Sequence, residues 1–246
     1  MGLQCTLKFE LKSNCLTRCT FVVAPGEITH VKSIAHNAFS GAIPKELGNL
    51  KQLTLLSLGI NNFSGSLPPE LGNLVELIEI YIHSCGVDGE IPSTFANLTK
   101  MQKMWASDNP FTGKIPDFIG NWTDLTSLRF QGNSFEGPIP SSFAKLTSLT
   151  SLRITDLANV SSNLDFIKDM KNLIELRLRN ALISDSIPSN IGEYNSLKTL
   201  DLSFNNLTGQ IPSALFNMTS LTYLFLGNNS LSGDLPSQKS NTLQNM

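Results

Sequence analysis

The stretch LKQLTLLSLGINNFSGSLPPELGNL, residues 50–74, contains one full copy of a pattern that recurs along almost the whole chain. An Ile-Pro or Leu-Pro pair returns every 24 residues, with prolines at Pro44, Pro68, Pro92, Pro116, Pro140, Pro188, Pro212 and Pro236. The one missing proline would fall at Leu164, and the count resumes correctly after it. A fixed period of this length predicts one small structural unit stacked many times, a solenoid rather than a globule.

The other positions of the repeat predict a shared core and a sheet. Three, six and nine residues after each proline position the side chain is apolar in almost every unit, as in Leu71, Leu74 and Leu77. Before the proline, apolar residues such as Leu56 and Leu58 alternate with others, which indicates a short strand with one buried face. Because every unit runs in the same direction, the stacked strands are expected to form a parallel sheet.

A polar column lies seven residues before the proline. Its asparagines are Asn37, Asn61, Asn109, Asn133, Asn205 and Asn229. A buried asparagine can donate to and accept from the backbone of a neighbouring turn, so we expect these side chains to be structural. Cys85 occupies the same column. A structural role is the main interpretation for it, and a reactive thiol is the alternative.

Composition excludes several classes of function. The 246 residues carry a net charge of −2, so no global basic field exists to hold nucleic acid. No apolar run approaches the roughly 20 residues that span a bilayer, and we expect no membrane contact by this segment. The first thirty residues lack the apolar core of a secretion signal.

The cysteines and histidines give no catalytic or metal site. Cys5, Cys15 and Cys19 fit either a disulfide-stapled cap or thiols in a disordered leader, and no ligand spacing for zinc accompanies them. The chain has 3 histidines, none at metal spacing with a carboxylate partner. No phosphate loop, kinase motif or triad context is present, so we expect neither an enzyme nor a cofactor.

The pattern L-x-x-L-x-L-x-x-N-x-F-S-G-x-I-P resembles a leucine-rich repeat, and its G-x-I-P half is similar to the plant extracellular type. This resemblance implies an α/β leucine-rich-repeat solenoid of about nine 24-residue repeats, with a parallel sheet on the concave face. It also implies a second short strand per repeat and a twisted superhelix. The stretches 91–108, 115–132 and 163–180 look like the ectodomain of plant leucine-rich-repeat receptor-like serine/threonine kinases, in the subfamily with a malectin-like domain.

The expected organisation is an atypical or truncated N-terminal segment at 1–28, a solenoid at 29–236 without an internal boundary, and the start of an incomplete further repeat at 237–246. No capping repeat is recognisable at either end, so we interpret the chain as a fragment of a longer receptor. In the sixth unit, Asp165 predicts a capped helical turn after Leu164. Local repair of a lost motif and a functional loop both remain open there.

The outward positions of the strands predict the binding surface. The candidate ligand-binding residues are Tyr81, His83, Trp105, Arg129, Arg153, Arg177 and Arg179. Neighbouring strands lie about 4.8 Å apart, so the outward column that runs from Ser57 to Phe225 is expected to span about 35 Å. Aromatic and arginine side chains dominate interface hot spots. In several plant receptors of this class an Arg-x-Arg pair holds the free carboxylate of a peptide hormone, and Arg177 with Arg179 resembles it. The alternative is a charged surface balanced by Glu175, Asp156 and Asp201.

Seven N-x-Ser/Thr sequons predict glycosylation, at Asn62, Asn97, Asn121, Asn159, Asn206, Asn217 and Asn228. Asn97, Asn121 and Asn217 share one column on the expected convex side. The alternative is that Asn-Leu-Thr is merely repeat consensus.

These observations favour an extracellular recognition module of a plant receptor-like kinase, on the outer face of the plasma membrane by resemblance. Its expected partners are a peptide or protein ligand and a co-receptor, and its kinase lies outside this chain. A secreted defence protein of the polygalacturonase-inhibitor kind is the second hypothesis. A truncated decoy product is the third.

Overall fold

A computed structural model describes residues 8–9, 21–22, 30–235 and 240–243. Near the N-terminus, β1 (Lys8–Phe9) pairs with β2 (Phe21–Val22) in antiparallel fashion. The expectations for Cys5, Cys15 and Cys19 fall outside the described residues, and so does the last proline of the pattern, Pro236.

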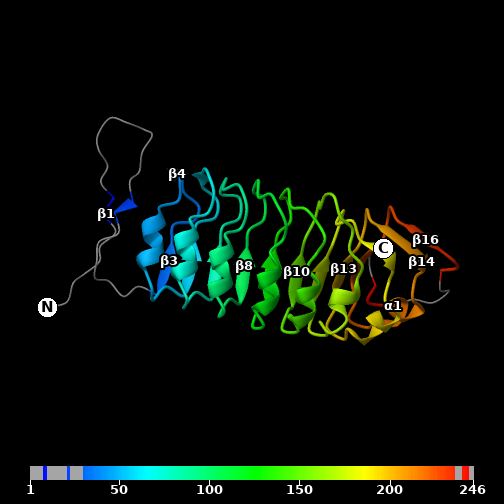
Figure 1. Cartoon of the computed structure of the whole chain (residues 1–246). Coiled ribbons are helices and arrows are strands. Elements are labelled where there is room, and N and C mark those ends of the chain that lie inside the picture. The colour runs from blue at the N-terminus through cyan, green and yellow to red at the C-terminus, as the bar shows by residue number, and fades with distance from the viewer. Residues whose placement is uncertain (1–7, 10–20, 23–29, 236–239, 244–246) are drawn as a thin grey trace. The chain divides into compact units, whose positions relative to one another are not determined.

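The chain divides into two compact units, one ending at Thr112 and the other beginning at Gly113. The sequence predicts no such boundary. In a solenoid each turn contacts only its neighbours, so few contacts join distant turns and the contacts group locally. Each unit is a stack of turns, visible side by side in Figure 1.

The inner sheet of each unit is built from three-residue strands, one per turn. The N-terminal unit contributes β3 (Val31–Ser33), β5 (Leu55–Ser57), β7 (Glu79–Tyr81) and β8 (Lys103–Trp105). The C-terminal unit contributes β9 (Ser127–Arg129), β10 (Ser151–Arg153), β11 (Glu175–Arg177), β13 (Thr199–Asp201) and β15 (Tyr223–Phe225). Neighbouring strands are parallel and pair residues one repeat apart, such as Leu56 with Ile80. The predicted parallel sheet is confirmed.

A second set of short parallel strands follows the inner strands. In the N-terminal unit, β4 (Ser40–Gly41) pairs with β6 (Asn62–Phe63). In the C-terminal unit, β12 (Ser184–Ser186), β14 (Asn206–Gln210) and β16 (Ser230–Ser232) form a three-stranded sheet. These strands match the second strand that the resemblance implies.

One helical turn per repeat lies on the other side of the stack from the inner strands (Figure 1). These turns are η1 (Lys45–Asn49), η2 (Pro69–Asn73), η3 (Ser93–Asn97), η4 (Asp117–Asn121), η5 (Ser141–Lys145), η6 (Asp165–Ile167), η7 (Ser189–Glu193) and α1 (Ser213–Asn217), of which only α1 is an α-helix. Except at η6, the residue before the turn is the repeat proline, whose φ of −57° to −67° is pre-set by its ring.

The helical turn predicted at Asp165 is present but differs from the prediction. It has only three residues, and Leu164 stands in the cap position. Asp165 is its first helical residue and not its cap. Its backbone N–H donates to Oδ1 of Asn163 at 3.1 Å, which forms an Asx turn just before the helical turn.

In some turns, close packing on the next turn requires glycine in the helical segment. A Cβ atom on Gly72 would lie 2.4 Å from the carbonyl oxygen of Thr94 in the next turn. The core that results is apolar: Leu71, Leu74 and Leu77 are fully buried, as are their counterparts in most described turns. Burial of this kind supplies most of the stabilising free energy, at about 25 cal/mol per Å² of apolar surface.

Four asparagines of the column join their turn to the one before it, namely Asn61, Asn109, Asn205 and Asn229. Nδ2 of Asn109 donates to the carbonyl oxygen of Ile82 at 2.7 Å, and also to two carbonyl groups of its own bend. Its Oδ1 accepts from the N–H groups of Cys85 and Gly86, each at 3.0 Å. The side chain therefore satisfies backbone groups of two turns that the bends leave unpaired. Asn37 is exposed and, among the residues that the structure describes, bonds only to its own bend.

Replacing Asn109 with alanine should lower the free energy of unfolding by about 2–4 kcal/mol, because buried backbone donors and acceptors lose their partner. Chemical denaturation followed by circular dichroism measures it. Asn37→Ala is the matched control and should cost less than about 1 kcal/mol. Equal losses in both variants would contradict a stabilising role for the bonds between turns.

Candidate ligand-binding surface

The outward face of the N-terminal unit carries an aromatic cluster. Tyr81 and Trp105 stand opposite each other on β7 and β8, and their rings meet edge to face with centroids 4.8 Å apart. The ring of His83 lies 6.3 Å from that of Trp105. All three side chains are partly exposed. His83 has room because residue 59 is glycine: a Cβ atom there would lie 2.8 Å from Cε1 of His83.

The charges beside this aromatic cluster cancel. Oη of Tyr81 donates to Oε2 of Glu79 at 2.6 Å, and Nζ of Lys103 lies 2.9 Å from Oε1 of the same carboxylate. Burial raises the pKa of Glu79, but the two hydrogen bonds and the lysine charge outweigh it and hold the pKa below its ordinary value. The surface here is therefore aromatic and close to neutral.

The outward face of the C-terminal unit is cationic. Arg129, Arg153 and Arg177 occupy equivalent positions on β9, β10 and β11 and stand in one row across the sheet. All three are partly exposed. Like charges directly opposite each other on neighbouring strands are destabilising, so this row needs compensation.

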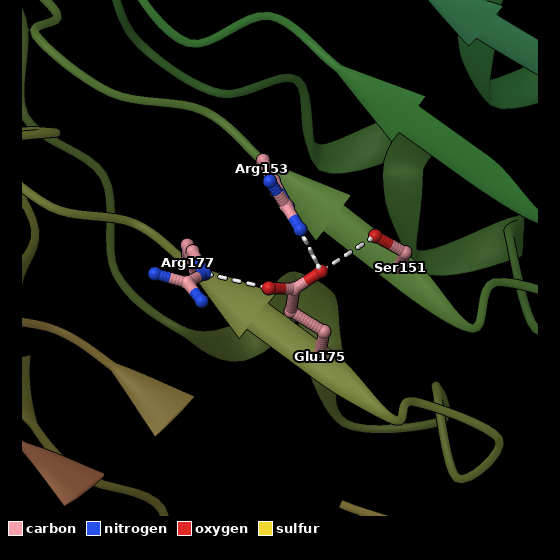
Figure 2. A network of polar contacts seen from close by, with 4 residues as sticks. All are labelled: Ser151, Arg153, Glu175 and Arg177. Carbon is pink, nitrogen blue, oxygen red and sulfur yellow. Dashed lines mark hydrogen bonds and ion pairs between the residues drawn. The ribbon is translucent and has the colours of Figure 1, made fainter. Parts of the chain in front are cut away.

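Glu175 supplies that compensation from β11. Figure 2 shows its carboxylate between two arginines and Ser151. Oε2 lies 2.7 Å from a terminal nitrogen of Arg153, Oε1 accepts from Nε of Arg177 at 2.6 Å, and Oγ of Ser151 donates to Oε2 at 3.2 Å. Burial raises the pKa of Glu175, but the hydrogen bonds and charges of both arginines outweigh it, and the pKa lies below its ordinary value. One carboxylate is thus shared by two arginines.

Arg179 is held by different neighbours. Its guanidinium lies over the ring of Phe204 with Cζ 3.9 Å from the centroid, and one of its terminal nitrogens donates to Oγ of Ser203 at 3.1 Å. Ser203 in turn donates to Oδ1 of Asp201 at 2.6 Å. No carboxylate lies within ion-pair distance of Arg179 in the part of the chain that the structure describes.

The positive charge of this row is only partly balanced. Of the three carboxylates that the sequence suggests as partners, only Glu175 pairs with arginine in the described residues. Asp156 accepts from Asn180 and Thr155, and Asp201 accepts from Ser203. Arg153, Arg177 and Arg179 therefore carry more positive charge than Glu175 removes. Guanidinium groups with free donors can hold a carboxylate by paired hydrogen bonds.

Two features of this surface are missed by sequence reasoning. Asp201 lies in the outward column but is buried, with only 8% of its surface exposed, since Ser203 folds over it. Phe204 is 44% exposed, has a φ of 59°, and orients Arg179. Phe204 lies one repeat and one residue after Arg179 in the sequence. That spacing predicts a contact between the two side chains only once the pairing of the neighbouring strands is known.

The remaining candidate residues are the sequon asparagines and Cys85. The side chains of the seven sequon asparagines are all exposed. Cys85 is buried and its Sγ lies 2.9 Å from the carbonyl oxygen of Ile82. Burial raises the pKa of its thiol to about 11, which counts against a reactive thiolate. Within the described ranges, no group of three potential metal ligands gathers, and no helix is long and apolar enough to cross a membrane.

Comparison with known proteins identifies the repeat. The family model described as Leucine Rich Repeat matches residues 52–74, 100–122, 124–146, 196–218 and 220–241. With the parallel inner sheet, this shows that the fold is a leucine-rich-repeat solenoid. No curated protein sequence matches the chain.

Solved structures similar to this chain include ectodomains of plant receptors. The plant peptide hormone receptor RGFR1, solved with RGF2, is 30% identical with a TM-score of 0.76, over 82% of this chain and 32% of that one. The Arabidopsis thaliana receptor kinase GASSHO1/SCHENGEN3, solved with CASPARIAN STRIP INTEGRITY FACTOR 2, is 33% identical with a TM-score of 0.74, over 83% and 27%. Arabidopsis HAESA, solved with the peptide hormone IDA and the co-receptor SERK1, is 27% identical with a TM-score of 0.62, over 83% and 42%. The chain thus spans about a third of the length of the first two.

Changing Glu175 to glutamine should make the free energy of unfolding depend less on pH in the acid range. Its pKa is lowered on folding, so its contribution is complete above the ordinary value of 4.5 and is lost as pH falls through the folded-state pKa. We expect the variant to be about 1–2 kcal/mol less stable at pH 7, with the difference shrinking below about pH 4. Urea denaturation at several pH values measures this.

The control for that comparison is Glu193→Gln. Glu193 pairs with Lys171 at 2.8 Å, but its side chain is 64% exposed. Solvent screens such a pair, so the variant should lose less than about 1 kcal/mol. A gap between wild type and Glu175→Gln that stays constant from pH 7 to pH 3 would contradict the bridging role of Glu175.

Proposed function

We propose that this chain is an extracellular repeat segment of a plant receptor-like serine/threonine kinase, from the subfamily with a malectin-like domain between the repeats and the membrane. It binds a peptide or protein ligand through the outward face of its inner strands, and a co-receptor joins the complex. The kinase that reads out this binding is a separate part of the receptor. The segment acts at the outer face of the plasma membrane as a glycoprotein.

The observation that carries the proposal is the arginine row with its single shared carboxylate. Arg153 and Arg177 share Glu175, and Arg179 is stacked on Phe204 without an ion-pair partner in the described residues. Repeated like charges cost stability in a sheet, so their presence favours a binding role over a structural one. A free C-terminal carboxylate of an extended peptide is the ligand group that fits Arg177 and Arg179.

The similar structures support the same class of ligand. RGFR1 was solved with RGF2, and GASSHO1/SCHENGEN3 with CASPARIAN STRIP INTEGRITY FACTOR 2. HAESA was solved with the peptide hormone IDA and the co-receptor SERK1. The solenoid is proposed to run over 29–236, after an atypical segment at 1–28 and before the start of a further repeat at 237–246. The aromatic cluster of Tyr81, His83 and Trp105 is proposed as the neutral part of the ligand surface.

Binding should depend on a free carboxylate. Peptides of about 12 residues from a synthetic library would be screened by fluorescence polarisation, each as a free acid and as a C-terminal amide. We expect bound peptides to lose about tenfold in affinity on amidation, since charged hydrogen bonds are worth about 1.5–3 kcal/mol. Arg177→Ala and Arg179→Ala should cause similar losses, and Trp105→Ala about 1–2 kcal/mol.

Lys168→Ala is the control, because it removes one positive charge from an exposed residue after η6, away from the inner strands. It should leave the affinity unchanged. A peptide that binds equally as acid and amide, and equally to all the arginine and tryptophan variants, would overturn this choice of surface.

Full-length transcripts across this coding region test the parent receptor. We expect the reading frame to continue into a malectin-like domain, a membrane span and a kinase. Transcripts confined to these 246 codons would instead favour the secreted defence protein or the decoy product. Long-read sequencing of complementary DNA gives the answer without any assumption about the ligand.

A further inference from the structure

A polar groove of about 450 Å³ lies between η7 and α1 in the C-terminal unit. Its volume falls within the range of about 300–1,000 Å³ that is usual for small-molecule sites. Hydroxyl and amide side chains dominate its lining, namely those of Ser189, Asn190, Asn195, Asn217, Thr219 and Ser220. Such groups both donate and accept hydrogen bonds, which suits a ligand rich in hydroxyl and amide groups.

The groove is electrically neutral. Glu193 is the one charged residue that lines it, and its carboxylate lies 2.8 Å from Nζ of Lys171. The same Nζ lies 4.8 Å from the ring centroid of Tyr194, which fixes the ion pair at one side of the groove. A neutral lining favours an uncharged ligand over a phosphate or a cation.

Ala214 lines the groove at a position where other turns carry a bridging hydroxyl group. In an equivalent position, Thr94 donates through Oγ1 to the carbonyl oxygen of Pro69 in the preceding turn at 2.6 Å. Ser142 makes the same bond to Asp117 at 2.8 Å. The turn containing α1 has Ala214 at this position, and alanine has no hydroxyl group to bridge to the preceding turn. The two turns still pack closely there, since a Cβ atom on Gly192 would lie 2.6 Å from the Cβ atom of Ala214.

Asn217 provides a covalent attachment point at this groove. It is the last residue of α1, its side chain is exposed, and it begins the sequon Asn217-Met218-Thr219. Asn97 occupies the same repeat position in the N-terminal unit, at the end of η3. Pro69, Glu70 and Val75 stand there where Ser189, Asn190 and Asn195 line the groove. The lining beside Asn217 is therefore the more suitable for a sugar.

We propose that the groove holds the first N-acetylglucosamine of an N-linked glycan on Asn217. The donor is a lipid-linked oligosaccharide: its anomeric C1–O bond to pyrophosphate breaks, and a C1–Nδ2 bond to Asn217 forms. The amide loses one proton, and the lipid pyrophosphate leaves. The proposal rests on the passage through the secretory pathway that the proposed function includes. The sugar ring replaces water between η7 and α1 and ties the two turns together.

A glycan held in the groove should resist enzymatic release. The full chain would be secreted, behind a signal peptide, from cells that make only oligomannose glycans. It would then be treated in its native state with an endoglycosidase that cleaves between the two core sugars. We expect release from Asn217 to be about fivefold slower than from Asn97, which corresponds to one net hydrogen bond. Site-specific glycopeptide mass spectrometry follows both sites in the same sample.

Two controls make this comparison specific. After denaturation both glycans should be released at equal rates. Ala214→Thr adds a hydroxyl and a methyl group to a residue that lines the groove, so it should narrow the groove and speed release from Asn217 without changing Asn97. Glycan at Asn97 with none at Asn217, equal native rates at the two sites, or no effect of Ala214→Thr would each overturn the proposal.

The outcomes also separate this site from the proposed function. Absence of glycan from every sequon of the secreted chain would overturn both the groove and the glycoprotein part of that function. Loss of carboxylate-dependent peptide binding would overturn only the ligand surface, because the groove is lined by residues of η7, α1 and the segments that follow them.

Discussion

The hydrogen bonds of the buried asparagine column are the constraint on which the rest of the structure depends. Each bend leaves backbone N–H and C=O groups pointing into an apolar core, where an unpaired group costs about 1–3 kcal/mol. An amide side chain is short and both donates and accepts, as Asn109 does toward Ile82, Cys85 and Gly86. Because its partners lie in the preceding turn, the bonds set the register of one turn on the next.

This register decides what the outward face can be. Residues one repeat apart must stand side by side, so a repeated arginine becomes a row of like charges at strand spacing, about 4.8 Å. The fold gains nothing from such a row, and Glu175 offsets only part of its repulsion. The same rule brings Tyr81 and Trp105 into contact in the N-terminal unit. Residues that recur at the repeat period in the sequence therefore become neighbours on the outward surface.

The fold is largely readable from the sequence because periodic positions determine it. The apolar columns, the parallel strands and their pairing follow from the 24-residue period alone. For the candidate site, the sequence predicts which types of residue face outward but not the contacts that they make. The sharing of Glu175, the burial of Asp201 and the stacking of Arg179 on Phe204 depend on side-chain rotamers and on distances between turns. Leucine in place of the proline at position 164 predicts a disturbed turn, but not that the side chain of Asn163 accepts a hydrogen bond from the backbone N–H of Asp165.

That disturbed turn shows which part of the repeat is indispensable. The sixth unit loses its proline, and its helical turn shortens to three residues, yet Ile167, Met170 and Leu173 stay fully buried. The core columns therefore hold the turn in place, whereas the proline only pre-sets its backbone. Since the core columns persist without the proline, residues on either outer side can vary without loss of the fold. The arginine row on one side and the groove beside Ala214 on the other are two uses of that freedom, one suited to a charged peptide end and one to a neutral sugar.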